Sequence, residues 1–71
     1  MSKSISEARK WLEKIQRLHE HGAGNCSSQA NSYRNEIGEI YKKAKDNDKP
    51  GITSLYKEAT NLTDEIEKRE R

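Results

Sequence analysis

Residues 26–44 read CSSQANSYRNEIGEIYKKA, and the spacing within this stretch is the strongest indication of the fold. Apolar or small residues recur there at alternating steps of four and three: Cys26, Ala30, Tyr33, Ile37, Ile40 and Ala44. Steps of this size place all six side chains along one face of an α-helix. The pattern predicts a central helix over about residues 25–46, with Asn25 as its N-cap and one apolar face to bury.

The segments on either side show the same spacing. The upstream face consists of Ile5, Ala8, Leu12 and Ile15. The downstream face consists of Ile52, Leu55, Ala59, Leu62 and Ile66. A helix over about 4–21 is expected to end at the Gly-Ala-Gly run that follows it, and a helix over about 50–69 is expected to carry Pro50 in its first turn.

Both turns lie where an antiparallel arrangement requires them. If Ile5 faces Ile40, the first chain reversal is centred on residues 22–23. If Ile40 faces Leu55, the second reversal is centred on residues 47–48. Both centres coincide with runs of helix-breaking residues,. We therefore expect an all-α fold, a small antiparallel three-helix bundle in which the central helix contacts both neighbours.

Length and composition limit the class of protein. A chain of 71 residues with a net charge of +2 is expected to form a single domain, residues 1–71, with a small core,. No stretch is apolar enough to span a bilayer, so we expect no membrane association. The single cysteine cannot form an internal disulfide, which favours a cytoplasmic location,.

Catalytic and metal chemistry find little support in the sequence. His19, His21 and Cys26 form an H-x-H-x4-C cluster near the first turn, and their side chains are zinc-ligand types,. A structural zinc site needs four ligands, and no obvious fourth residue accompanies them. A bundle of this size also leaves little room for a buried active site. We expect no metal, no cofactor and no enzymatic activity.

Four large side chains flank the apolar faces instead of lying on them. Trp11 and Leu18 flank the first helix, while Tyr41 and Tyr56 flank the second hairpin near its turn. Trp11 has two interpretations, an edge of the core or an aromatic anchor for a partner. These four residues predict a protein-interaction module (a regulator, inhibitor or adaptor) that binds a partner protein. Self-association is an open alternative, and the small size suggests a phage or other mobile element as source.

Nucleic-acid binding is the alternative function. Arg9, Lys10, Lys14 and Arg17 line part of the first helix and could contact phosphates,. Glutamates interrupt this basic stripe, and the whole chain is only weakly basic,. We therefore place this interpretation second.

Overall fold

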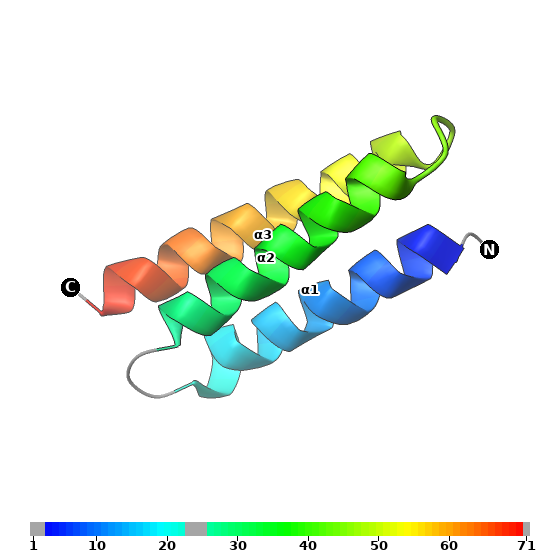
Figure 1. Cartoon of the computed structure of the whole chain (residues 1–71). Helices are drawn as coiled ribbons and strands as arrows, with labels where there is room; N and C mark the ends of the chain where they lie inside the picture. Colours follow the sequence, from blue (N-terminus) through cyan, green and yellow to red (C-terminus); the bar gives the residue numbers. More distant parts are fainter. Residues whose placement is uncertain (1–2, 23–25, 71) are drawn as a thin grey trace.

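The computed structural model describes residues 3–22 and 26–70. It contains three helices: α1 (Lys3–His21), α2 (Ser27–Lys43) and α3 (Lys49–Arg69). The helices lie side by side, α2 running opposite to α1 and α3 (Figure 1). Each helix packs against the other two, which confirms the predicted antiparallel three-helix bundle.

The bundle is a short rod of 38 × 16 × 15 Å, so its two ends are separate surfaces. We call the end that holds the α2–α3 turn the tip, and the start of α1 lies at the same end (Figure 1). The opposite end, where α1 and α3 finish and α2 begins, is the base. No helix in the described ranges combines the length and low polarity needed to cross a membrane.

The α2–α3 turn takes more of the chain than the spacing predicts. Helix α2 ends at Lys43, before the predicted end at 46, because Ala44 adopts an extended backbone with ψ of 157°. The N–H of Asp48 then donates to the carbonyl of Lys45 at 2.9 Å, which closes the turn. Pro50 lies in the first turn of α3, as expected, because that position needs no backbone donor,.

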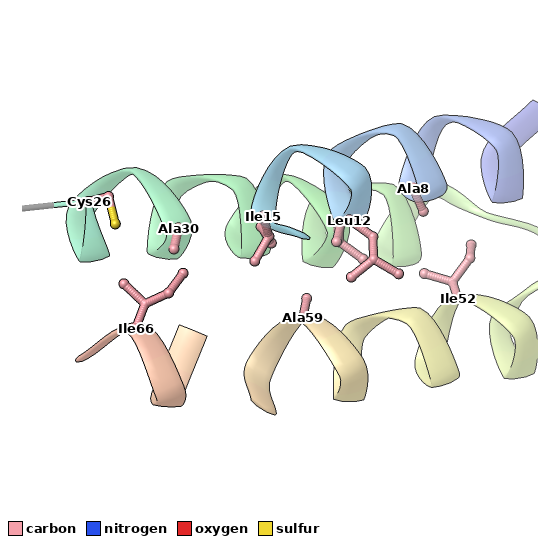
Figure 2. Packing of buried hydrophobic residues seen from close by; sticks show 9 residues of the cluster. Ala8, Leu12, Ile15, Cys26, Ala30, Ile52, Ala59 and Ile66 are labelled. Atoms are coloured by element: carbon pink, nitrogen blue, oxygen red, sulfur yellow. The ribbon is translucent and has the colours of Figure 1, made fainter. Parts of the chain in front are cut away.

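The core follows the axis of the bundle, and most of its members carry the predicted spacing (Figure 2). The buried hydrophobic residues are Ala8, Leu12, Ile15, Cys26, Ala30, Ile37, Ile52, Ala59 and Ile66. Leu55 and Leu62, which were expected on the central face of α3, are only partly buried and pack against this cluster. Thr63 is fully buried, although its type did not suggest it. Its hydroxyl donates to the carbonyl of Ala59 at 2.7 Å, which satisfies the buried polar group,.

Polar contacts between α2 and α3 gather at the base. The backbone N–H of Ser27 donates to the Glu70 carboxylate at 3.0 Å. The amide of Asn31 donates to Glu67 at 3.1 Å. The N-cap residue of α2 is Cys26, and its side chain makes no capping hydrogen bond. Glu70 therefore caps α2 from the far end of the chain. The predicted cap, Asn25, lies outside the described residues.

The base also holds polar contacts between α1 and α3. His19 Nε2 lies 2.6 Å from a carboxylate oxygen of Glu65. The guanidinium of Arg69 donates to the backbone carbonyl of His19. These contacts and those of α2 connect all three helices at one end. At the tip, by contrast, the ion pairs Glu39–Lys42 and Asp46–Lys49 join residues only three positions apart.

Candidate functional site

The two tyrosines of the second hairpin lie on the surface of the tip. Tyr41 and Tyr56 are 38% and 36% exposed, and they are the large hydrophobic side chains that remain exposed in the described part of the chain. They line one groove between α2 and α3, with a volume of about 490 Å³ and an almost entirely apolar wall. The groove is lined by Gly38, Tyr41, Lys42, Thr53, Tyr56 and Lys57.

Gly38 lines this groove without a side chain of its own. A Cβ atom at this position would lie 3.5 Å from Cε2 of Tyr56, an ordinary van der Waals contact. The backbone geometry therefore does not require glycine here, and the missing side chain leaves space beside the tyrosine ring. Because glycine inside a helix lowers stability by up to about 1 kcal/mol, the open space has an energetic cost.

Lysines form the rim of the groove. Lys42 and Lys57 line it directly, and Lys49 Nζ lies 5.4 Å from the centroid of the Tyr41 ring. No carboxylate is among the lining residues. The groove therefore combines an apolar wall with positive charge at its edge. It can bind an apolar side chain and attract negative charge beside it.

Trp11 and Leu18 lie in different surroundings. Both are partly buried and pack against the core. The Trp11 ring lies 5.5 Å from that of Tyr33 across the α1–α2 contact. Lys14 Nζ covers its face at 4.4 Å from the ring centroid. Of the two interpretations of Trp11, these contacts favour the edge of the core.

The basic residues of α1 do not form one surface. Lys10, Lys14 and Arg17 are exposed at steps of four and three, so they share a helical face,. Arg9 is exposed as well, but it precedes Lys10 by one position and points about 100° away around the helix,. Lys14 is in addition engaged over the Trp11 ring.

The histidines and the cysteine at the base have separate partners. His19 pairs with Glu65, and His21 pairs with the neighbouring Glu20 at 3.6 Å. Cys26 is free and buried. In residues 3–22 and 26–70, no group of three or more His, Cys, Asp or Glu side chains is arranged to hold a metal ion.

The sequence indicated the two tyrosines of this site but not Gly38, which lines the groove between them. By its type alone, Gly38 indicates only a weak point within the helix. The antiparallel register offers a usable signal, because a turn centred on 47–48 places Gly38 opposite Lys57, next to Tyr56. A glycine facing an aromatic neighbour across a hairpin predicts open space beside the ring. The rim lysines are not distinctive by themselves, since lysine is abundant along the chain.

The fold and this site define a small helical bundle with an exposed, tyrosine-lined groove at one end. No protein-family model, curated protein or solved structure matches the chain. Its function is therefore inferred from the chemistry of the groove and of the surrounding surface.

Proposed function

We propose that this chain is a non-enzymatic protein-interaction module, acting as a regulator, inhibitor or adaptor, that binds a partner protein through the groove between α2 and α3. The observation that carries the proposal is the exposure of Tyr41 and Tyr56 on either side of an open apolar groove. Tyrosine is enriched where proteins bind one another, because its ring is apolar and its hydroxyl can remain in contact with water.

The position of the groove supports this role. The polar contacts that connect the three helices gather at the base. The groove lies at the other end of the bundle, the tip. A partner at the tip can therefore engage the tyrosines without disturbing the polar contacts at the base.

The residues that line the groove favour binding over catalysis. They supply tyrosine, lysine and threonine side chains but no carboxylate, histidine or cysteine. A general acid and base, or an activated nucleophile, usually requires such groups. The free Cys26 is compatible with the reducing cytoplasm that this proposal assumes,.

The test is capture of a partner from a nuclease-treated extract of the native host by the tagged chain. Gly38→Leu places a bulky side chain in the groove. The control variant Ser32→Leu adds the same side chain to the exposed surface of α2 outside the groove. We expect one defined protein to be captured by the wild type and Ser32→Leu and lost with Gly38→Leu. Equal capture by all three would contradict the proposal.

Nucleic-acid binding through α1 remains the alternative, and the same experiment separates it. The triple variant Lys10→Glu/Lys14→Glu/Arg17→Glu reverses the exposed basic face of α1. Under our proposal it captures the same protein as the wild type. If capture depends on these three residues, or disappears with nuclease treatment, the alternative replaces the groove model.

A further inference from the structure

The charge of the groove identifies the chemistry of its occupant. Lys57 lines the groove and has no ion-pair partner in the described ranges. Lys42 has only an exposed contact of 3.5 Å with Glu39, on its own helix. Two cations thus border the groove, with little internal compensation. Negative charge on a ligand would neutralise these two lysines.

The charge of the tip differs from face to face. A depression between the start of α1 and the α2–α3 turn is lined by three lysines and one aspartate: Lys3, Ser4, Lys43, Lys45, Asn47 and Asp48. A neighbouring depression between α1 and α2 is lined by three carboxylates and a single lysine: Ser4, Glu7, Glu36, Glu39, Ile40 and Lys43. The sign of the surface charge therefore changes between adjacent faces of the same end. Charge steers an acidic ligand away from the carboxylate-lined face, and the almost entirely apolar wall distinguishes the groove beside Tyr41 and Tyr56 from the other lysine-lined depression,.

The extent of the groove limits the length of the occupant. Its lining comes from residues 38–42 of α2 and residues 53–57 of α3, about one helical turn of each,. A docked amphipathic helix usually inserts apolar residues over two or more turns. We therefore expect one bulky apolar side chain as the anchor, placed in the groove that Gly38, Tyr41 and Tyr56 line.

We propose that the groove receives one bulky apolar side chain from an acidic peptide segment of the partner, whose flanking carboxylates pair with Lys42 and Lys57. This inference rests on the proposed function and specifies the partner. A second copy of the chain is a poor occupant, because a symmetric contact through this groove would bring the same lysines together. A nucleic-acid strand normally engages cations over several consecutive phosphates, a longer track than one turn provides.

The test uses a phage-displayed library of random twelve-residue peptides, selected on the immobilised full-length chain. We expect enrichment of peptides with one large apolar residue flanked by Asp or Glu. Binding of a fluorescein-labelled enriched peptide should weaken by about tenfold or more with Gly38→Leu and with Lys42→Glu/Lys57→Glu, since each lost exposed ion pair costs a factor of a few. Ser32→Leu should bind as the wild type does.

Charge reversal in the peptide provides the decisive control. When the acidic residues of the enriched peptide are replaced by lysine, it should bind Lys42→Glu/Lys57→Glu better than the wild type. Thermal unfolding checks that each variant is folded. If Lys42→Glu/Lys57→Glu does not fold, Lys42→Gln/Lys57→Gln replaces it and should weaken binding of the acidic peptide.

The possible failures are distinguishable. Peptides that depend on Gly38 but ignore the charge at positions 42 and 57 would overturn the acidic partner and leave the groove as an interaction site. Absence of any peptide sensitive to Gly38→Leu would overturn both proposals. Self-association in sedimentation that Gly38→Leu abolishes, or a labelled oligothymidylate that displaces the peptide, would assign the groove to another occupant.

Discussion

At the scale of single residues, Gly38 within α2 and Gly22 just after α1 have opposite roles. Gly38 leaves open a space that a methyl group would fill without a clash. At Gly22, a Cβ atom would collide with the backbone carbonyl of Leu18 and lie 2.9 Å from Cys26 Sγ. The first glycine shapes a surface, and the second permits a close approach at the base.

This difference yields a matched prediction. Gly38→Ala should raise the free energy of unfolding by about 0.5–1 kcal/mol, because alanine is the better helix former and the site has room. Gly22→Ala should lower it, because the backbone or Cys26 must move. Denaturant unfolding of the two variants measures both effects. A loss of stability in Gly38→Ala would show that the space beside Tyr56 is not open.

The two threonines of α3 provide a second contrast. The Thr60 hydroxyl is buried without a hydrogen-bond partner in the described structure, while that of Thr63 donates to Ala59. We expect Thr60→Val to raise the free energy of unfolding by up to about 1 kcal/mol, because it replaces an unsatisfied hydroxyl by a methyl group of similar shape. Thr63→Val should lower it, since a methyl group cannot lie 2.7 Å from a carbonyl oxygen. Equal effects in denaturant unfolding would contradict this assignment.

At the scale of elements, the first turn of α2 depends on α3. The hydroxyl and the backbone N–H of Ser27 donate to Glu70, and these bonds hold the pKa of that carboxyl below its usual value near 4.5. The ionised form is therefore favoured by folding. Its contribution to stability is present above pH 4.5 and is lost as the pH falls through the lower pKa of the folded state.

The corresponding prediction concerns Glu70→Ala. At pH 7 this variant should melt below the wild type, because the start of α2 loses its acceptor. The difference should shrink in acid, as the pH falls from 4.5 through the lower pKa of Glu70 in the folded state,. Circular-dichroism melting at pH 7 and pH 3 measures it. Glu58→Ala, which removes an exposed carboxylate of the same helix, should show no such pH-dependent difference.

At the scale of the whole molecule, one core serves all three helices. Each helix packs against the other two, and Ile37 of α2 is fully buried between them. Helices of about 20 residues are only marginally stable alone, so their order depends on this shared packing. We expect unfolding to be a single cooperative transition in which the helices are lost together.

Ile37→Ala tests this dependence. Removal of a fully buried isoleucine should cost about 2–5 kcal/mol, a large part of the total stability of a small domain. Helical circular dichroism and the near-ultraviolet signal of Trp11 should be lost at the same denaturant concentration, well below that for the wild type. Ile40→Ala, at a partly buried position, should cost less. Separate transitions for the two signals would indicate that the helices do not share one core.

The helices, their order and their antiparallel pairing could be predicted without any structure. The heptad spacing and the helix-breaking residues are local features. They predicted the ends of the helices within a few residues and most of the residues that form the core. The same spacing placed Tyr41 and Tyr56 beside the apolar faces of their helices. These predictions succeeded because helical periodicity is recorded in each segment without reference to the others.

The rotation of each helix toward its neighbours, by contrast, is set by the packing of the folded molecule. That rotation buries Thr63 and leaves Leu55 and Leu62 partly exposed. It also brings Glu70 to the start of α2 across 43 positions of the chain. The groove arises in the same way, because the open space at Gly38 becomes a site only when α3 places Tyr56 and Lys57 beside it. Such contacts depend on side-chain packing between helices, which no single segment encodes.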